Sequence, residues 1–379
     1  MLEHTFVDFH LLKLLEEYEQ SGYPPVDLLA SRYFRANRAL GASDRRQIAS
    51  GFFGIIRWAG TLEALSAHGS WSEMIALWKE GSWLDELGRL APYLRCGFPR
   101  ELYELLVDQY GEEAAQKLCV VSNEEAPCCV RVNSLKIQRE ELQELWKGRF
   151  STQFTEHASS GLVLSKREPL LATEEFRKGF FEVQDEGSQL VAEQVAIRPG
   201  QLLLDYCAGS GGKSLAVAPR MEGKGQLFLY DVRSSQLLQA KTRLSRASVQ
   251  NSQCLLGAGA MLQLNKLKKR CDWVLVDVPC SGTGTLRRHP DMKWRCDRSF
   301  VMGVVGQQRS IFEKALSYLH PGGTIVYATC SILEQENQRQ IDHFIATYEL
   351  ELDGEPLCTL PISSGMDGFF AARLRRRVK

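Results

Sequence analysis

Residues 202–214 read LLLDYCAGSGGKS, and this stretch decides the fold. Its first four residues, Leu202–Asp205, form an apolar run of strand length that ends in an acid. Gly209, Gly211 and Gly212 follow, and because glycine has no Cβ they let a ligand approach the backbone closely. A strand, a glycine-rich turn and a helix in this order are typical of the ligand loop of a doubly wound α/β domain.

The chain repeats strand, turn and helix from residue 198 onward. The candidate strands are Leu202–Asp205, Gln226–Tyr230, Gln253–Leu256, Trp273–Asp277 and Thr324–Thr329. The segments between them are mostly long enough for crossover helices, which predicts a parallel, Rossmann-like sheet with helices on both faces. A ligand should lie across the carboxyl ends of these strands, near the point where their order reverses.

The first ninety or so residues are predicted to be helical, since apolar residues recur there at spacings of three and four. Gly22–Pro25 predicts a break between two helices, and Ser43 predicts an N-cap. A further helical stretch is expected over residues 100–121. From Cys129 the pattern changes, with a strand predicted at Val130–Asn133 and a helix at 140–146. We therefore expect three parts: a helical domain at 1–95, a small α+β segment at 96–180 and the main domain at 181–379.

The composition excludes several classes of protein. Lys plus Arg and Asp plus Glu each total 46 in 379 residues, so the net charge is zero and any nucleic-acid site must be a local patch. The eleven cysteines include no Cys-x-x-Cys pair, so we expect neither a metal site nor a disulfide framework. No apolar run reaches membrane-spanning length, and the first ten residues carry Glu3 and Asp8. We expect a cytoplasmic protein that uses no membrane.

The glycine-rich loop matches neither common phosphate-binding motif. A P-loop needs Gly at the position of Cys207, and a dinucleotide loop starting at Gly209 needs Gly or Ala at Ser214, so the latter stays open only as an incomplete match. Asp231 follows the second strand, where a carboxylate can accept hydrogen bonds from both hydroxyls of a ribose. Alternatively, Asp231 caps the next helix. Taken together, these features favour S-adenosylmethionine as cofactor.

Two cysteines follow neighbouring strands. Residues 277–284 read DVPCSGTG and residues 328–331 read ATCS, which places Cys280 and Cys330 near the same sheet edge as Asp277. Because C5 of cytosine is a poor nucleophile, a thiolate must first add at C6, and C5 can then accept an electrophilic methyl group. A thiolate, an acid and a methyl donor therefore fit methylation of a pyrimidine carbon. The spacing alone does not say which cysteine attacks.

The motifs resemble those of the Nop/Sun family of RNA cytosine-5 methyltransferases, which includes bacterial Sun-like rRNA enzymes. The matching runs are the glycine-rich loop, DVPCSGTG, RRHPDMKW at 287–294, YATCS at 327–331, RVNSLK at 131–136, QDEGS at 184–188 and DGFFA at 367–371. They span about residues 100 to 379 in the order that the family shows.

The resemblance implies roles for individual residues. It makes Cys330 the nucleophile and Cys280 the residue that assists release, and it places Asp277 between cofactor and base. The implied cofactor-binding residues are Cys207, Ala208, Gly209, Ser210, Gly211, Gly212, Lys213, Asp231 and Asp277. Lys213 could favour a thiolate electrostatically, or it could be a solvent-facing lysine at a helix start. The N-terminal part corresponds to the NusB-like RNA-binding domain of the bacterial rRNA enzymes, and the implied partner is RNA, most simply rRNA, bound by a monomer.

Two positions depart from the family. Ala258 stands where an acidic residue usually contacts the adenine amino group, and Gly209-Ser210 replaces the commoner Ala-Pro, which should loosen the loop. Loss of one such hydrogen bond typically weakens binding by about 0.5–1.5 kcal/mol.

RNA contacts are expected from the segment 287–298, which carries five Lys or Arg and Trp294 just after Cys280. The basic runs 266–270 and 373–379 could extend that surface or simply be solvated. A tRNA substrate and a noncatalytic RNA-binding assembly factor remain alternatives to an rRNA methyltransferase.

Overall fold

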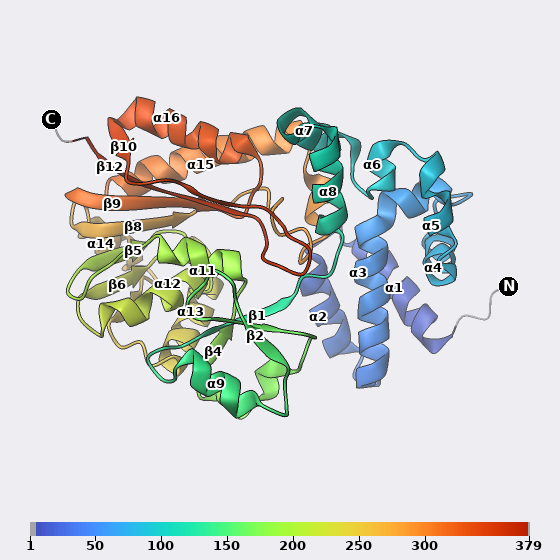
Figure 1. The fold of residues 1–379 in the computed structure, drawn as a ribbon, viewed down its shortest axis with the longest axis horizontal. Coiled ribbons are helices and arrows are strands. Elements are labelled where there is room, and N and C mark those ends of the chain that lie inside the picture. The colour runs from blue at the N-terminus through green and yellow to red at the C-terminus, as the bar shows by residue number, and fades with distance from the viewer. Residues whose placement is uncertain (1–4, 378–379) are drawn as a thin grey trace. The chain divides into compact units, whose positions relative to one another are not determined.

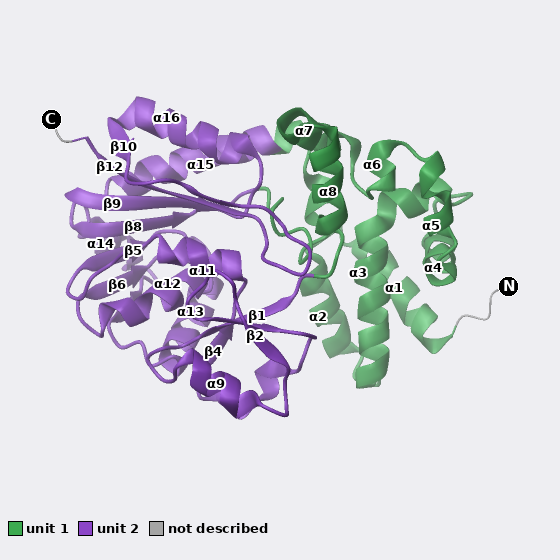
Figure 2. Ribbon diagram, in the orientation of Figure 1, with its two compact units in different colours: residues 1–125, 281–300 green, residues 126–280, 301–379 purple. Residues whose placement is uncertain are grey.

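The computed structural model describes residues 5–377 and divides the chain into two compact units (Figures 1 and 2). Unit 1 comprises residues 1–125 and 281–300, and unit 2 comprises residues 126–280 and 301–379. Unit 1 thus continues past residue 95 and takes in a segment that follows Cys280 in the chain. The three-part division expected from the sequence stays a prediction. No helix within residues 5–377 is long and apolar enough to cross a membrane.

Unit 1 is built from helices, as the sequence predicts. Its helices are α1 Phe6–Gln20, α2 Val26–Ala36, α3 Ala42–Leu65, α4 Trp71–Glu80, α5 Trp83–Glu86, α6 Pro92–Arg95, α7 Arg100–Tyr110 and α8 Glu112–Ser122. The break at Gly22–Pro25 separates α1 from α2, as expected. Ser43 is not an N-cap, because α3 begins at Ala42 and Gly41 holds that position. Instead, the carboxylate of Asp44, the residue after Ser43, accepts the Gly41 N–H at 3.0 Å and so caps the helix.

The segment 287–298 is tied into unit 1. Arg287 and Lys293 are each only 1% exposed, and Lys293 Nζ donates to the Arg57 carbonyl at 2.6 Å and to Asn123 Oδ1 at 2.7 Å. The Trp294 indole N–H donates to the Ile56 carbonyl at 2.7 Å, and its ring packs against the helical core. The prediction that this segment supplies phosphate contacts and a stacking ring is therefore wrong for these three residues, which hold the segment onto the helices.

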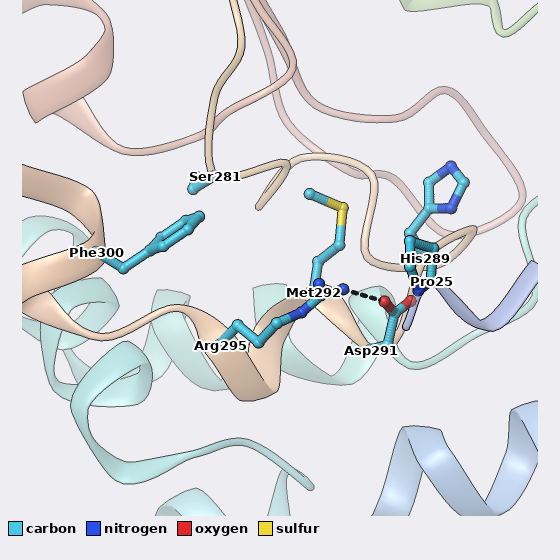
Figure 3. A pocket seen from close by; sticks show the side chains of 7 residues that line it. All are labelled: Pro25, Ser281, His289, Asp291, Met292, Arg295 and Phe300. Atoms are coloured by element: carbon cyan, nitrogen blue, oxygen red, sulfur yellow. Dashed lines mark hydrogen bonds and ion pairs between the residues drawn. The ribbon is translucent and has the colours of Figure 1, made fainter. Parts of the chain in front are cut away.

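A cavity of about 220 Å³ lies within unit 1 beside the same segment (Figure 3). Met292 and Phe300 are among its lining residues, and the buried Asp291 carboxylate forms an ion pair with Arg295. Arg298 pairs with Asp108 at 2.9 Å. Two further cations of the segment are thus neutralised locally, which explains how a basic sequence run can form part of a folded helical unit.

Unit 2 contains two sheets (Figure 1). The smaller, antiparallel sheet has the order β2-β3-β1-β4 and packs with α9 and α10 around the fully buried Trp146 and Phe181. Its elements are β1 Cys128–Val132, α9 Arg139–Trp146, β2 Thr152–Phe154, β3 Gly161–Leu164, α10 Glu174–Arg177 and β4 Phe181–Val183. The predicted strand at Val130–Asn133 and the predicted helix at 140–146 are both present within one or two residues.

The larger sheet has the order β10-β12-β9-β8-β5-β6-β7, with β11 paired to β12. Its strands are β5 Leu202–Asp205, β6 Gln226–Leu229, β7 Ser252–Cys254, β8 Cys271–Asp277, β9 Leu319–Thr329, β10 Leu350–Leu352, β11 Leu357–Thr359 and β12 Phe369–Arg376. Within the group of five strands β5 to β9, every pairing is parallel. Strand β12 runs antiparallel to β9. All five predicted strands are present, and the predicted doubly wound α/β fold is confirmed.

Helices cover both faces of this sheet (Figure 1). They are α11 Glu186–Glu193, α12 Gly212–Val217, α13 Ser234–Arg246, α14 Ala260–Asn265, α15 Arg298–Leu316 and α16 Gln338–Tyr348. Successive strand residues point to opposite faces, so Leu203 packs in the core with α11 to α13 and Leu204 in the core with α14 to α16. Because both faces are covered, these strands read as continuous apolar runs.

The strand order reverses between β5 and β8, since β6 and β7 lie on one side of β5 while β8 and β9 lie on the other. The carboxyl ends of β5, β6, β8 and β9 meet at one edge there. The basic run 266–270 precedes β8, and Arg375 pairs in register with Thr324 in the middle of β9. Residues 266–270 and 373–377 therefore lie away from the strand ends that carry the cysteines, which favours the alternative that these basic residues are solvated.

We expect Lys293→Met to destabilise unit 1. The substitution keeps much of the buried volume but leaves the Arg57 carbonyl and Asn123 Oδ1 without their donor, which costs about 1–3 kcal/mol for each buried acceptor. Five of the seven tryptophans belong to unit 1, so urea unfolding followed by tryptophan fluorescence reports on it. The control Arg298→Gln removes an exposed ion pair and should change the free energy of unfolding by about 0–1 kcal/mol. Equal effects of the two substitutions would contradict the structural role of Lys293.

Candidate active site

The glycine-rich loop connects β5 to α12 at the edge where the strand order reverses. Gly209 and Gly211 have φ angles of 51° and 79°, which a residue with a side chain rarely adopts. A Cβ on Gly211 would lie 3.0 Å from the Ala240 side chain, whereas a Cβ on Gly209 would meet no atom within 4 Å. Gly211 therefore serves the packing of the loop on α13, and Gly209 leaves its backbone open to a ligand.

Three motifs that are distant in the sequence pack together next to this loop. The Gln184 amide donates to Ser188 Oγ at 3.1 Å and, more weakly, to the Gly212 carbonyl at 3.5 Å, while its Oε1 accepts from buried Arg131 at 2.7 Å. The motifs RVNSLK and QDEGS thus meet directly beneath the loop. The third motif, DGFFA, packs on Gly187, where a Cβ would lie 2.6 Å from the Phe369 ring.

Arg243 on α13 also holds the loop, a role that the sequence did not predict. Its guanidinium donates to the Ser210 carbonyl at 2.9 Å and to Ser210 Oγ at 2.7 Å, and it pairs with buried Glu182 at 3.1 Å. Ser210 was expected to loosen the loop in place of proline. Its hydroxyl instead accepts a charge-assisted hydrogen bond, which offsets the freedom that a proline would have removed.

Asp231 lies just after β6 beside the loop. Its carboxylate accepts the backbone N–H groups of Gly209 and Arg233, each at 2.8 Å, and pairs with the Arg233 side chain at 3.0 Å. Burial raises the pKa of Asp231, but the hydrogen bonds from Arg233 and Gly209 outweigh it and hold the pKa below its ordinary value. Asp231 does not cap α13, because the N-cap residue of that helix is Arg233 and no side chain caps it. Asp231 accepts the N–H of Arg233 itself and not an N–H of the first helical turn. The carboxylate is thus ionised and preorganised as an acceptor beside the ligand loop.

Asp277, the last residue of β8, forms an ion pair with Lys213 of α12, with 2.5 Å between Nζ and Oδ2. Burial lowers the pKa of Lys213, but Asp277 and, to a smaller degree, Cys330 raise it more, so the lysine stays charged. The Lys213 side chain is only 12% exposed. The alternative of a solvent-facing lysine is therefore wrong, and Lys213 supplies a buried positive charge within electrostatic reach of Cys330.

The two cysteines lie together at the ends of β8 and β9. The Sγ atoms of Cys280 and Cys330 are 3.2 Å apart, and the Cys330 backbone N–H points to Cys280 Sγ at 3.3 Å. Cys207, by contrast, is packed in the core on the other side of Asp205, where burial raises the pKa of its thiol well above the ordinary value. The site therefore pairs two partly exposed thiols with one buried cation, and Cys207 takes no part in thiolate chemistry.

The donors present fit S-adenosylmethionine. An open glycine backbone at Gly209 and an ionised acid after β6 offer groups that a nucleoside can contact, and Arg233 is 63% exposed along its side chain, so it can leave Asp231 when a ligand binds. Ala258, the position at which the resemblance implies an acid, lies on an exposed turn between β7 and α14. Within residues 5–377 no cluster of His, Cys, Asp and Glu could hold a metal ion.

Comparison with known proteins places the chain in a family. Residues 192–375 match the model of the 16S rRNA methyltransferase RsmB/F, and residues 98–170 match the ferredoxin-like domain of the same proteins. The chain belongs to the RsmB/F family. This confirms the resemblance to Nop/Sun enzymes that the motifs indicate.

Relatives of the RsmB/F family are similar over much of the chain. Ribosomal RNA small subunit methyltransferase B of Vibrio cholerae is 33% identical over 75% of this chain and 66% of its own length, and that of Klebsiella pneumoniae is 34% identical over 69% and 62%. The chain thus spans slightly less than two thirds of the length of these relatives.

Solved structures agree with the RsmB/F assignment. A methyltransferase homolog protein from Pyrococcus horikoshii is 27% identical, with a TM-score of 0.64 over 76% of this chain and 98% of that one. NSun6 from the same organism, solved with SFG, has a TM-score of 0.64 over 74% and 99% at 20% identity, which shows the fold alone. The fold is that of S-adenosylmethionine-dependent methyltransferases, and the predicted cofactor agrees with the family.

Asp205 gives the site a pH-dependent stability. It is fully buried beneath the loop, and burial raises its pKa to about 7 despite a hydrogen bond from Ser214 at 2.7 Å. The folded state therefore binds more protons than the unfolded state between about pH 4, the unfolded pKa, and pH 7, and stability falls as the pH rises through this window. We expect Asp205→Asn to remove this part of the pH dependence, measured by urea unfolding at pH 4.5 to 8. A wild-type curve parallel to that of the variant would contradict a buried, titrating Asp205.

Proposed function

We propose that this chain is an S-adenosylmethionine-dependent RNA (cytosine-5) methyltransferase that acts on rRNA. The observation that carries the proposal is the pair of thiols 3.2 Å apart, at adjacent strand ends beside the Lys213–Asp277 ion pair. Methylation of nitrogen or oxygen needs no thiol, because these atoms have lone pairs of their own. Methylation of the pyrimidine C5 needs a nucleophile that adds at C6. The names of the relatives, which refer to ribosomal RNA, support rRNA as the substrate.

The chain's own residues divide the work in this proposal. Lys213, held charged by Asp277, favours the thiolate of Cys330, which adds to C6 of the cytosine and moves the electrons of the C5–C6 double bond to C5. S-Adenosylmethionine supplies the methyl group on a positively charged sulfur. In this proposal Asp277 hydrogen-bonds the edge of the base and stabilises the adduct. Cys280 assists the elimination that returns Cys330 to its thiolate.

The proposed cofactor site uses the loop and the acid after β6. The residues that would hold the cofactor are Cys207, Ala208, Gly209, Ser210, Gly211, Gly212, Lys213, Asp231 and Asp277. Within this set the carboxylate of Asp231 offers the direct polar group, and Gly209, whose N–H is donated to Asp231, leaves room for the ligand because it has no Cβ. Gly211 and Ser210 act by fixing the shape of the loop. The target base must be unpaired or flipped out of a helix before it can reach Cys330.

Cysteine substitutions test the reaction. We expect Cys330→Ser to stop methyl transfer and Cys280→Ala to accumulate a covalent enzyme–RNA adduct, because the first variant lacks the nucleophile and the second lacks the residue that assists release. The assay uses methyl-tritiated cofactor with rRNA and, in parallel, tRNA, followed by nucleoside analysis and denaturing gels. If label appears only in tRNA, the substrate is tRNA and not rRNA. If an adduct forms with Cys330→Ser, the roles of Cys330 and Cys280 are reversed. If calorimetry shows cofactor binding while no RNA is labelled in any cytosine, the chain is a noncatalytic binder and the proposal is wrong.

Ala258→Asp tests the cofactor position. We expect it to tighten cofactor binding by about 0.5–1.5 kcal/mol, since a carboxylate on this turn restores an acceptor for the adenine amino group. Isothermal titration calorimetry measures the change, and Gly259→Ala, one residue further along the same exposed turn, is the control. Unchanged affinity in Ala258→Asp would mean that the adenine does not lie at this turn.

A further inference from the structure

A layer of buried polar side chains in unit 2 contacts the loops that carry Cys280 and Cys330. Its central members are Gln308 on α15 and Glu336, which stands in the short turn between β9 and α16, and both are fully buried. Burying an amide and a carboxyl group is costly unless each is hydrogen-bonded. The contacts of these two residues therefore show what the layer holds in place.

Gln308 reaches the Cys280 loop. Its Nε2 donates to the Pro279 carbonyl at 3.1 Å and to Glu336 Oε2 at 2.9 Å. Its Oε1 accepts from Gln340 Nε2 at 2.9 Å and lies 3.1 Å from the Tyr327 hydroxyl, whose shorter hydrogen bond, at 2.7 Å, goes to the Glu336 carbonyl. Since the Pro279 carbonyl only accepts, the orientation of the amide is fixed, and both of its N–H groups and its oxygen are hydrogen-bonded.

Glu336 reaches the Cys330 loop. Its Oε1 accepts the Ser331 hydroxyl at 2.5 Å, and the Ser331 oxygen in turn accepts the Leu333 N–H at 3.1 Å. Ser331 directly follows Cys330, just as Pro279 directly precedes Cys280. The hydrogen bond between Gln308 and Glu336 thus joins the two loops one residue away from each sulfur.

We propose that the Gln308–Glu336 hydrogen bond positions Cys280 against Cys330 and so sets the rate at which the covalent RNA adduct is released. The part of this inference that concerns adduct release rests on the proposed function. In the release step Cys280, as a thiolate, takes the C5 proton. The C5–H electron pair then re-forms the C5–C6 double bond, and the bond between C6 and Cys330 Sγ breaks with its electrons on sulfur. Proton transfer of this kind depends steeply on distance, because the base must be within hydrogen-bonding reach.

The test compares Gln308→Met with Gln340→Met. Both replace a fully buried glutamine by an apolar side chain of similar length, but the partners of Gln340 are Val305, Arg309, Tyr327 and the oxygen of Gln308, none of which is in a cysteine loop. Gln340→Met therefore keeps the two hydrogen bonds that Gln308 Nε2 makes to Pro279 and Glu336. In single-turnover assays we expect Gln308→Met to slow adduct release about tenfold, whereas Gln340→Met releases at close to the wild-type rate. The KM for RNA and the Kd for cofactor should stay unchanged in both variants. Glu336→Met, which leaves the Gln308 N–H and the Ser331 hydroxyl without their acceptor, should behave like Gln308→Met.

A second measurement does not depend on RNA. Phenylarsine oxide bonds two neighbouring thiols through arsenic with loss of one water molecule, and its affinity reports how well the sulfurs of Cys280 and Cys330 are placed. The difference between wild type and Cys280→Ser isolates this pair from the other cysteines. We expect Gln308→Met to weaken this capture about tenfold and Gln340→Met to leave it unchanged.

The two measurements separate the possible failures. Equal arsenical affinity and equal release rates in Gln308→Met and Gln340→Met would overturn the positioning role. Weakened arsenical capture in Gln308→Met, together with no methyl transfer to any RNA by the wild type, would support the positioning of the sulfurs while the proposed function fails. An altered KM or cofactor Kd in Gln308→Met without a change in adduct release would also overturn the inference, because it would place Gln308 in substrate binding.

Discussion

The site depends on parallel pairing of β8 with β5 on one side and with β9 on the other. Parallel strands end at the same edge, so β5, β8 and β9 all end there, with Asp205 in register with Leu275 and Asp277 in register with Ala328. Three loops with no sequence proximity then share one rim. The glycine-rich loop, the Cys280 loop and the Cys330 loop could not meet in an antiparallel arrangement of the same strands, whose neighbouring ends alternate between two edges.

Charge at this rim is arranged around one buried cation. Desolvation disfavours a charged lysine, yet Asp277 at 2.5 Å more than compensates for it, and the charge of Lys213 remains available to Cys330. Asp205, also fully buried and beneath the same loop, lacks a cation in contact and has a raised pKa. Of these two acids, only Asp277, which bonds the lysine, lies at the exposed rim. The ion pair thus places its cation within electrostatic reach of the thiols.

The sequence predicts the central strands well because β5, β8 and the second half of β9 are apolar runs bounded by polar turns, and it predicts the cysteine pair because both cysteines follow such runs. It fails for the segment 287–298. Five basic residues around a tryptophan suggest a nucleic-acid surface, but a side chain's burial depends on what folds over it. Lys293 donates to the Arg57 carbonyl of α3 and to Asn123 at the end of α8, and the Arg57 side chain donates to the Arg287 carbonyl. Gln308, Glu336 and Arg243 were also missed. A glutamine in a long helix carries no periodic or motif signal, and its role arises only from contacts with loops 29 and 28 residues away.

Ser210 and Ala258, the two positions that depart from the family pattern, differ in whether another contact compensates for the change. Ser210 keeps the loop in place through Arg243, so the loss of a proline is offset by a contact from another helix. Ala258 has no such replacement on its exposed turn, and the change there concerns a single hydrogen bond to the cofactor. The groups around the sulfurs, by contrast, are buried and fully hydrogen-bonded, and a change in any one of them would leave a partner unsatisfied in the interior. Cofactor affinity can therefore vary at the rim of this fold at small cost, whereas the spacing of the two thiols is fixed by a network that tolerates few substitutions.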